Sequence, residues 1–493
     1  VAAAIDWADC VLFFSEGEGL GIVILDTLAR GRVPVVRRAG GASEALPATL
    51  DDCFIDSDSP AEFADRVERF MRDPASIRER VAAAARAMRD RKEYGKILAD
   101  QYRKRIGTGR TRVLHVITRM IVGGAQENTL ASVAFVDPAR FDSDLWTGPQ
   151  TGTEGDLRGR AERIGVLPVY FPNVVRELNP PRDMLATWQL YRMLRRRRYD
   201  IVHTHSSKIG IIGRLAARFA GVPHVVHTAH GWGFHDHMAG WLRWIYVSLE
   251  KLVLPMTDQL VTVSDETTRV GLAAGIGRAE DYALIRSGIP TGEFHADEAR
   301  GAEVRAELGI ANDRVVIGTV GRLSPQKNPL DFVRVAAAVC AKHERAHFVS
   351  IGEGPLRAEV EAAIREAGLE GRISLLGLRD DVPDLMRAMD LYIMTSLWEG
   401  LPRVVVQALA TGVPVISYDV AGTKEIVRDG KNGFLVPPGD WESLAGHIDT
   451  ILSDKAMRTE LRHVCSNEFD LSFTETKMVH DLEDLYESLM TTK

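Results

Sequence analysis

The sequence has little cysteine, no excess of positive charge and no long apolar run. Its four cysteines, at positions 10, 53, 340 and 465 of 493, lie far apart, and none forms a C-x-x-C or another metal-binding spacing. A reducing cytosol is the simplest environment for such a chain. The net charge of −7 provides no basic field for nucleic acid, so we expect small molecules or local patches as partners.

Several common motifs are also missing. No run of 18 apolar residues exists, so the sequence predicts no membrane-spanning helix and a cytoplasmic location. Complete G-x-G-x-x-G, Walker and H-E-x-x-H motifs are absent, which leaves nicotinamide, P-loop and zinc-protease sites without support. The chain begins at Val1 with residues typical of a helix end and shows no signal peptide, so we expect a piece of a longer polypeptide.

What is present is an alternation of short apolar segments with helical patterns. The predicted strands lie at 112–118, 200–206, 224–230, 259–264, 314–322, 347–354, 372–377, 390–396 and 413–418. Continuous apolar strands separated by helices are typical of parallel sheets covered on both faces, which predicts an α/β fold. Two doubly wound domains in series, separated by the Gly- and Pro-rich segment 287–301, predict a cleft lined by loops at strand carboxyl ends.

The first 107 residues repeat part of the second domain. "EGLGIVILDTLARGRVPV" from Glu18 matches "EGLPRVVVQALATGVPV" from Glu399, which lies 399 − 18 = 381 residues later. Nothing in 1–107 corresponds to 314–384, so we expect a partial Rossmann-like half-domain there. Two copies so far apart cannot stack as neighbours in a solenoid.

The segment "GTVGRLSPQKN" places two cations after a predicted strand. Arg322 and Lys327 share a loop with Gly321, and such a pair at a strand end suits the oxygens of a phosphate. Solvated surface charge is the other interpretation, since that is the usual place of Arg and Lys. The strand-end position favours an anion site.

Two glycine-containing loops also follow strands. Gly123 and Gly124 either let backbone approach a ligand or serve a tight turn before a helix. In "SLWEGLPRVVVQALATG", Glu399 and Gly400 precede a helix that we expect to begin near Leu401 or Pro402. Glu399 is either a ligand in the cleft or a helix cap, and Gln407, two turns on, is either a ligand or part of a polar helix face.

Histidine is concentrated in one region. Seven of the 14 histidines lie between His203 and His237, and His203 and His205 share a strand face. A zinc site is conceivable, but no cysteine is nearby. We expect His230, at the end of its strand, to be functional and the others to be structural. Two D-x-D triplets, Asp56/Asp58 and Asp142/Asp144, are typical of turns before or between strands.

One helix has a possible surface role. In 182–198, an apolar stripe (Met184, Trp188, Tyr191 and Leu194) precedes four arginines. We favour a core-facing helix with cations at its carboxyl end; the alternative is a docking surface for anionic lipid, which would place the protein peripherally at the inner face of the membrane. The aromatic stretch after His230 is either a buried helix or the wall of an acceptor pocket.

Taken together, these segments resemble family-4 glycosyltransferases of the GT-B fold. The matching elements, in order, are "GGAQ", "HTAHG", "RSGIP", "GRLSPQKN", "IGEGP", "SLWEGLPRVVVQALATGVPVI" and "AGTKEIV". The resemblance covers 112–493 in full and 1–107 as a partial copy of a second such enzyme. It implies an acceptor-side domain at 112–295, a donor-binding domain at 296–473, and a last helix, 474–493, that crosses back to the first of these.

The same resemblance implies the chemistry. A retaining glycosyltransferase of this kind moves a sugar from a nucleotide diphosphate sugar to a glycan or lipid-linked acceptor, with no metal and no cofactor. Arg322 and Lys327 would bind the diphosphate, and Glu399 would contact sugar hydroxyls. His230 would face the reacting sugar or the acceptor. The other positions implied to bind the donor are Gly123, Gly124, Gly321, Gly400, Leu401, Pro402 and Gln407.

Gln407 departs from the family pattern, which has glutamate there. An amide accepts from a ribose hydroxyl without charge. Two other functions therefore stay open. One is a sugar-nucleotide epimerase or a phosphorylase on the same fold. The epimerase would change the sugar with no acceptor present. The other is a non-catalytic protein that binds nucleotide sugar without turnover.

Overall fold

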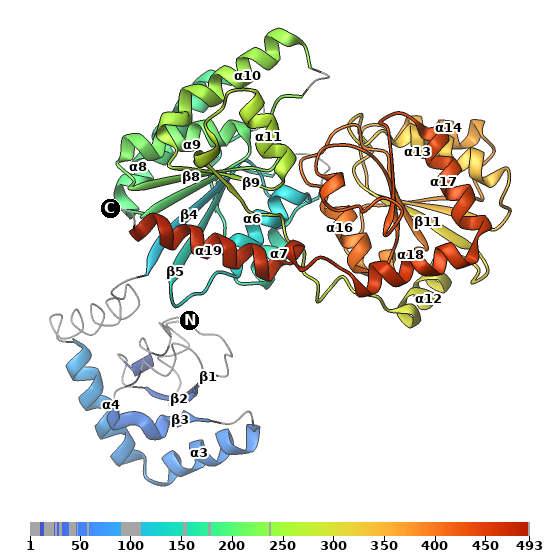
Figure 1. Cartoon of the computed structure of the whole chain (residues 1–493). Coiled ribbons are helices and arrows are strands. Elements are labelled where there is room, and N and C mark those ends of the chain that lie inside the picture. The colour runs from blue at the N-terminus through green and yellow to red at the C-terminus, as the bar shows by residue number, and fades with distance from the viewer. Residues whose placement is uncertain are drawn as a thin grey trace. The chain divides into compact units, whose positions relative to one another are not determined.

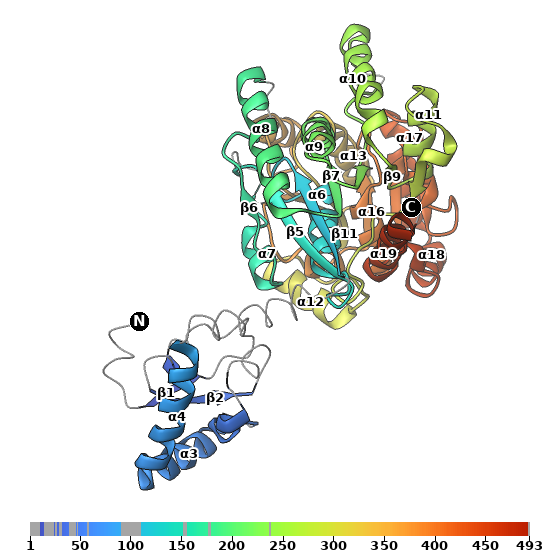
Figure 2. The same cartoon turned by 90° about the vertical axis from the view of Figure 1, so that its left-hand side faces the viewer.

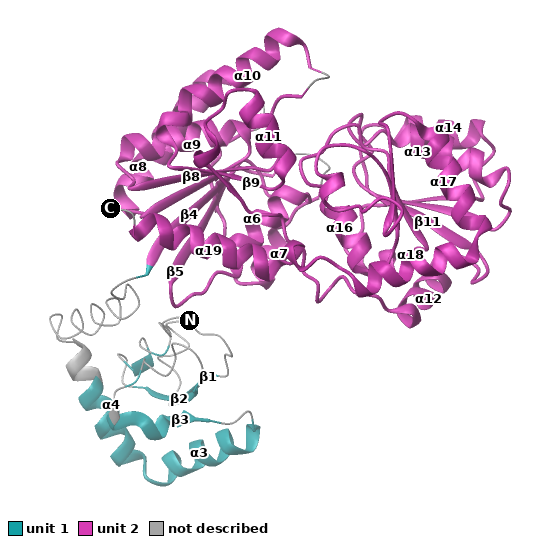
Figure 3. Ribbon diagram, viewed as in Figure 1, with its two compact units in different colours: residues 1–110 teal, residues 111–493 magenta. Residues whose placement is uncertain are grey.

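The computed structural model describes residues 10–13, 24, 27–28, 32–38, 46, 48–56, 59–89, 110–150, 155–175, 179–235 and 238–491. They belong to two compact units, Val1–Arg110 and Thr111–Lys493 (Figure 3). Four positions discussed above, Val1, Glu18, Asp58 and His237, lie outside the described residues.

The first unit contains a small parallel sheet. Its strands β1 (Cys10–Phe13), β2 (Val33–Arg37) and β3 (Phe54–Ile55) are paired in sequence order, and η2 (Ala48–Cys53), α3 (Pro60–Arg72) and α4 (Pro74–Arg89) accompany them. Buried Leu50, Phe63 and Val81 hold the helices to the sheet. Among the described strands β1 pairs with β2 alone, and Leu12 on β1 is exposed.

The second unit begins with a seven-stranded parallel sheet of order β10-β9-β8-β7-β4-β5-β6 (Figure 1). Its strands are β4 (Thr111–Ile117), β5 (Phe141–Thr147), β6 (Val169–Tyr170), β7 (Ile201–His205), β8 (His224–Ala229), β9 (Gln259–Thr262) and β10 (Tyr282–Leu284). Its helices are α6 (Gly124–Ala134), α7 (Arg158–Arg163), α8 (Pro180–Arg197), α9 (Ser207–Ala220), α10 (Gly240–Val253) and α11 (Asp265–Ala273). The strand order reverses between β4 and β7, and ligands of such sheets bind outside the carboxyl ends at that point.

A six-stranded parallel sheet of order β13-β12-β11-β14-β15-β16 follows. Its strands are β11 (Val315–Val320), β12 (Ala346–Ile351), β13 (Ile373–Gly377), β14 (Leu391–Met394), β15 (Val415–Tyr418) and β16 (Gly433–Val436). Its helices are α12 (Glu298–Glu307), α13 (Pro329–Cys340), α14 (Arg357–Glu366), α15 (Val382–Arg387), α16 (Arg403–Ala410), α17 (Trp441–Ser453) and α18 (Lys455–Asn467). The strand order reverses between β11 and β14, which defines a second crevice. The predicted α/β class with parallel sheets is confirmed.

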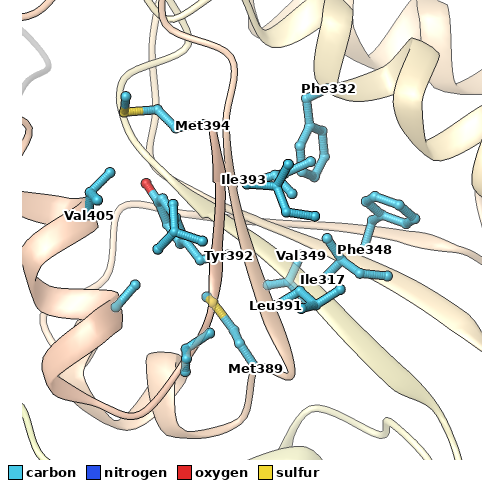
Figure 4. Packing of buried hydrophobic residues seen from close by; sticks show 14 of the residues in the cluster. Ile317, Phe332, Phe348, Val349, Met389, Leu391, Tyr392, Ile393, Met394 and Val405 are labelled. Atoms are coloured by element: carbon cyan, nitrogen blue, oxygen red, sulfur yellow. The ribbon is translucent and has the colours of Figure 1, made fainter. Parts of the chain in front are cut away.

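Apolar side chains from both faces fill the core of this second sheet. Figure 4 shows Ile317, Tyr392 and Ile393 on the central strands and Phe332 of α13 beside Phe348 of β12. The two phenylalanine rings lie edge to face with centroids 5.6 Å apart. This packing fixes β11 and β14 side by side, so the loops that follow them start from rigid positions.

The last helix, α19 (Glu475–Thr491), packs against the first sheet of the unit, not the second (Figure 1). Its buried Met478, Leu482 and Tyr486 belong to one apolar cluster with Val113 of β4 and Ile201 of β7. The two crossings of the chain between the sheets run together, since the amide of Ile289 donates to the carbonyl of Phe473 at 2.9 Å. The domain limits 112–295, 296–473 and 474–493 stay a prediction.

The prediction that the stripe of α8 faces the core holds for Tyr191 and Leu194, which pack in the core, and is wrong for the other two residues. Met184 and Trp188 are exposed by 73% and 51%. The buried side is formed by Ala186, Leu190 and Leu194, which pack on α9. Because Ala186 is small, the two helices approach closely on that side, and the larger side chains at 184 and 188 are turned outward.

Two smaller interpretations also fail. The aromatic helix after His230, α10, is not buried, because Trp241 and Trp244 are exposed by 68% and 70%. Asp142 and Asp144 lie within strand β5, not in a turn. Asp144 accepts a hydrogen bond from the phenol of Tyr199, which explains its place in a strand. No helix among the described residues combines the length and the apolar content needed to cross a bilayer.

Candidate active site

The loop after β11 forms one wall of a pocket. Arg322 and Lys327 line it together with Gly321, and Ser396 of the loop after β14 lies opposite. The carbonyl of Gly321 would be 2.1 Å from a Cβ at position 352, so the neighbouring loop can approach only because residue 352 is glycine. The two cations are thus held over the carboxyl ends of β11 and β14, where the strand order reverses.

Hydrogen bonds tie the loop after β11 to the loop after β14. The amide of Leu397 donates to the carbonyl of Gln326 at 2.8 Å, and the hydroxyl of Thr395 donates to the carbonyl of Lys327 at 2.9 Å. The ammonium of Lys327 donates to Glu399 Oε1 at 2.5 Å. Both side chains of this ion pair keep some exposure, 25% for Lys327 and 11% for Glu399, so a ligand can reach them.

Gly400 allows a loop of the six-stranded sheet to contact a loop of the seven-stranded sheet. A Cβ at this position would lie 1.9 Å from the carbonyl oxygen of His230. The residue at 400 must therefore be glycine for the loop after β8 and the loop after β14 to meet. Leu401 and Pro402 are buried behind it, and α16 begins at Arg403, one residue later than the predicted limit, with Pro402 as its N-cap.

The glycine loop after β4 meets the start of α16. Gly123 is the N-cap of α6, and Gly124 lies against Arg403, whose Cδ would be 3.2 Å from a Cβ at 124. Arg403 is buried and lies 3.4 Å from both the carbonyl of Gly124 and the carboxylate of Glu127. Burial holds the pKa of Arg403 below its ordinary value, and the charge of Glu127 opposes this shift.

His230 is partly exposed at the end of β8, and its ring is neutral. Burial, and to a smaller extent the charge of Arg403, lowers the pKa of His230 to about 3. The Nε2 of His230 lies 3.0 Å from Nδ1 of the buried His205. The imidazole is therefore oriented by a second histidine, and it carries no charge at neutral pH.

The structure thus brings together most of the residues predicted from sequence. Arg322, Lys327 and Gly321 share one pocket, Glu399 contacts Lys327, and Gly400 contacts the loop of His230. Gln407 lies one turn beyond Arg403 on α16 and is 7% exposed. None of the contacts found among the described residues joins Gln407 to Glu399 or Lys327.

Three residues were not found by sequence reasoning. Arg403 was overlooked because its partners Gly124 and Glu127 are more than 270 residues away in sequence. Ser396 is buried, and within the described part of the chain its hydroxyl has no hydrogen-bond partner. Its place at a strand end, repeated as Ser15 in the first copy, was the available indication. His115 belongs to the histidine cluster behind His230 and had no local indication.

This arrangement suits an anionic ligand with a polyhydroxylated part. Arg322 and Lys327 supply positive charge beside a buried hydroxyl, Glu399 supplies a hydrogen-bond acceptor, and the amino end of α6 adds backbone N–H groups across the loop contact. Preorganised cations at such a place stabilise charge that develops on a leaving group.

Comparison with protein families gives a consistent result. The profile of the "Glycosyl transferases group 1" family matches residues 1–88 and 302–468, and that of the "Glycosyl transferase 4-like domain" matches residues 123–288. A curated relative from Escherichia coli, the UDP-Gal:alpha-D-GlcNAc-diphosphoundecaprenol alpha-1,3-galactosyltransferase, is 30% identical over 388 residues, which is 78% of this chain and 98% of the relative. The alpha-D-kanosaminyltransferase of Streptomyces kanamyceticus is 25% identical over 71% of this chain and 92% of its own length.

Solved structures show the same fold. Anabaena Alr3699/HepE in complex with UDP-glucose superposes with a TM-score of 0.65 at 22% identity, over 77% of this chain and all of that one. The sucrose-phosphate synthase of Thermosynechococcus elongatus gives a TM-score of 0.65 at 20% identity, over 78% of this chain and all of that one. These likenesses confirm the predicted GT-B fold. From its sequence and its fold, the chain belongs to the group 1 glycosyltransferases, and it is a glycosyltransferase enzyme.

Proposed function

We propose that the protein is a retaining enzyme that transfers a sugar from a nucleotide diphosphate sugar to a hydroxyl of a lipid-linked glycan, without metal. The observation that carries this is the pocket in which Arg322 and Lys327 lie over the switch point of the second sheet, beside the contact of Gly400 with His230. The similarity to a transferase that acts on a diphosphoundecaprenol-linked sugar supports a lipid-linked acceptor.

In the proposed reaction, the bond from the anomeric carbon to the phosphate oxygen breaks while the acceptor oxygen attacks the same face of the sugar. The acceptor proton passes to an oxygen of the leaving diphosphate, so no protein base is required. Arg322 and Lys327 stabilise the charge that forms on the diphosphate. Glu399, freed in part from Lys327, accepts from sugar hydroxyls, and His230 faces the reacting sugar.

A panel of nucleotide sugars with a diphosphate-linked lipid acceptor tests this function. We expect release of nucleoside diphosphate with one donor, formation of a product with the donor's anomeric configuration, and full activity in EDTA. An inverted product would contradict the retaining mechanism, and activity restored only by Mn²⁺ or Mg²⁺ would contradict metal independence.

The same panel separates the two other functions. A sugar-nucleotide epimerase would change the donor sugar with no acceptor present, and a phosphorylase would need inorganic phosphate in place of an acceptor alcohol. A non-catalytic binding protein would bind donor without releasing nucleotide. The ion pair of Lys327 with Glu399 supports transfer, because it would put a cation beside the carboxylate that is proposed to bind the sugar.

Gln407 is proposed to hold the ribose with an uncharged acceptor. A charged hydrogen bond contributes about 1.5–3 kcal/mol and a neutral one about 0.5–1.5 kcal/mol. Gln407→Glu is therefore expected to tighten donor binding several-fold, mainly in KM, because the ribose contact changes little at the transition state. Calorimetric titration of donor into both proteins measures the effect. Binding that is unchanged or weaker in the variant would show that the ribose is held elsewhere.

A peripheral membrane contact is proposed for the face formed by α8, α9 and α10 (Figure 2). Exposed Trp188, Trp241 and Trp244 accompany basic residues there, and Arg192 lies 4.7 Å from the ring of Trp188. Aromatic rings among arginines are typical of helices that lie on anionic lipid.

We expect Trp188→Ser combined with Trp244→Ser to lower binding to vesicles of anionic phospholipid about tenfold or more, since burying one large apolar side chain contributes about 1.5–3 kcal/mol. Co-sedimentation measures this binding. Leu471→Ser is the control, because Leu471 is as exposed as Trp244, at 71% against 70%, but lies on another element, after α18. Equal binding of all three proteins would contradict the proposed surface.

Residues 1–107 are proposed to be the end of an upstream transferase joined in tandem. The order β1-β2-β3 followed by α3 and α4 parallels β14-β15-β16 followed by α17 and α18. The first strands of the two sets start 391 − 10 = 381 residues apart, which equals the sequence offset. Every site residue named above lies in the second unit.

A protein of residues 108–493 is therefore expected to keep the kcat/KM of the full chain. Residues 1–107 alone are expected to melt without a cooperative transition, because among the strands that the structure describes β1 pairs only with β2 and leaves an apolar edge. Transfer assays and thermal melts followed by circular dichroism test both statements. An inactive 108–493, or a sharp melt of 1–107, would contradict them.

A further inference from the structure

Six side chains form a continuous chain of hydrogen bonds that ends at His230. The links are Thr228 Oγ1 to His203 Nε2 at 2.6 Å, His203 Nδ1 to Tyr486 OH at 2.7 Å, Tyr486 OH to His115 Nε2 at 3.2 Å, His115 Nδ1 to His205 Nε2 at 3.0 Å, and His205 Nδ1 to His230 Nε2 at 3.0 Å. Three strands and the last helix contribute to it. All members except His230 are buried.

The rings in this chain are neutral. Burial lowers the pKa of His115 to about 3 and holds the pKa values of His203 and His205 well below the ordinary value. A neutral imidazole has one N–H donor and one bare nitrogen acceptor. Each of the three buried rings uses both nitrogens in the chain, so each must donate on one side and accept on the other.

The number of nitrogens already used in hydrogen bonds also argues against a metal ion between these rings. His115, His203 and His205 offer nitrogens within 4.8 Å of one another, as a metal site would. All six of their nitrogens already have a hydrogen-bond partner, however. A metal would need lone pairs that these hydrogen bonds occupy.

Only two arrangements of the protons are consistent with these links. A reversal at a ring would leave that ring with two donors or none, and a reversal at Tyr486 would leave its buried hydroxyl proton without an acceptor or ask one proton to serve two nitrogens. Either every hydrogen bond is donated from Thr228 toward His230, or every one is donated from His230 toward Thr228. The first places the proton of His230 on Nδ1. The second places it on Nε2 and leaves Nδ1 bare.

Thr228 decides between them. Its hydroxyl is buried, and His203 is its hydrogen-bond partner among the described residues, with no other found. If the donors pointed toward Thr228, the hydroxyl proton would have no acceptor in the core, and a buried donor without an acceptor is costly. With the opposite direction, all five buried protons have acceptors. The sixth lies on Nδ1 of His230, the partly exposed end of the chain beside Gly400.

We propose that this chain locks His230 as the Nδ1–H tautomer, so that His230 offers a hydrogen-bond donor to the substrate cleft. Its target is an oxygen of the donor sugar or of the leaving phosphate, and this part rests on the proposed function. An N–H donor cannot take the proton of the acceptor hydroxyl, so His230 is not the general base of the transfer. Tyr486, His115 and His205 are positioning residues that act through His230.

The tautomers can be observed without turnover. Protein labelled with ¹⁵N in histidine distinguishes protonated from bare ring nitrogens, and the spectrum of His230→Gln assigns the signals of His230. We expect His115, His203, His205 and His230 all to carry their protons on Nδ1. A wild-type His230 protonated on Nε2 would overturn the proposal, even if the protein transfers sugar. Stoichiometric metal lost in His203→Gln would also overturn it.

His205→Phe tests the locking itself. It removes the donor to Nε2 of His230 while keeping a ring of similar size, so His230 is expected to show averaged ¹⁵N shifts of two tautomers and kcat to fall about fivefold with KM unchanged. The control is His347→Phe, which removes a 2.9 Å hydrogen bond to Ser374 in the other sheet and should alter neither quantity at His230. Unchanged His230 signals in His205→Phe would refute the locking. Absence of any transfer by the wild type would instead refute the proposed function and leave the spectra decisive.

Discussion

Replacing Lys327 by alanine is expected to remove about 2–4 kcal/mol of transition-state stabilisation, which lowers kcat/KM roughly 30-fold to nearly 1000-fold. The ammonium lies in the pocket with Arg322 and 2.5 Å from Glu399. Its removal takes away a cation that meets charge developing on the diphosphate. It also leaves the carboxylate of Glu399 without its partner beside a dianionic ligand, so the two effects act in the same direction.

A second substitution separates these effects. In Lys327→Ala combined with Glu399→Gln, the repulsion is removed while the missing cation stays missing, so donor binding should recover in part and kcat should not. Lys342→Ala is the matched control, since Lys342 makes a 2.7 Å ion pair with Asp449 on the same domain away from the pocket. Steady-state kinetics with varied donor give both constants. Wild-type kcat/KM in Lys327→Ala would remove this residue from the site.

Sequence predicts well those groups of site residues that lie together in a single loop after a strand. Arg322 and Lys327 follow β11 within a few residues, and Glu399 and Gly400 follow β14. Apolar strand patterns locate the ends of such strands, and parallel strands bring all carboxyl ends to one edge of a sheet. The residues proposed to contact the donor could therefore be named before the fold was known.

The parts that sequence could not predict depend on contacts between distant segments. Arg403 meets Gly124 across 279 residues, and Tyr486 meets His115 across 371. No local pattern contains such a pair. The error on α8 has a different origin: apolar residues occur on two sides of that helix, and periodicity alone cannot say which side contacts α9. The buried side of α8 is the one that carries Ala186, and a single small residue gives little indication of this in the sequence.

Gly400→Ala is expected to reduce kcat/KM by about 100-fold with little change in the thermal midpoint of unfolding. The added methyl would lie 1.9 Å from the carbonyl oxygen of His230. Because Glu399 adjoins Gly400 and the carbonyl belongs to His230 itself, a shift of either backbone is expected to move one of these two side chains. The clash can be relieved by parting the two loops, which leaves each sheet intact. Misplacement of reacting groups by about 1 Å can cost 100-fold in rate, so a small separation is sufficient.

The control for this substitution is Gly446→Ala. Gly446 lies within α17, where a Cβ would meet no atom within 4 Å. Alanine there should leave kcat/KM unchanged and stabilise the helix by about 0.5–1 kcal/mol. Transfer kinetics and thermal melts of both variants provide the comparison. If Gly400→Ala keeps wild-type kcat/KM, the loops after β8 and β14 do not need to touch during transfer. If it loses stability in proportion to activity, the contact holds the fold together and does not serve to align the reacting groups.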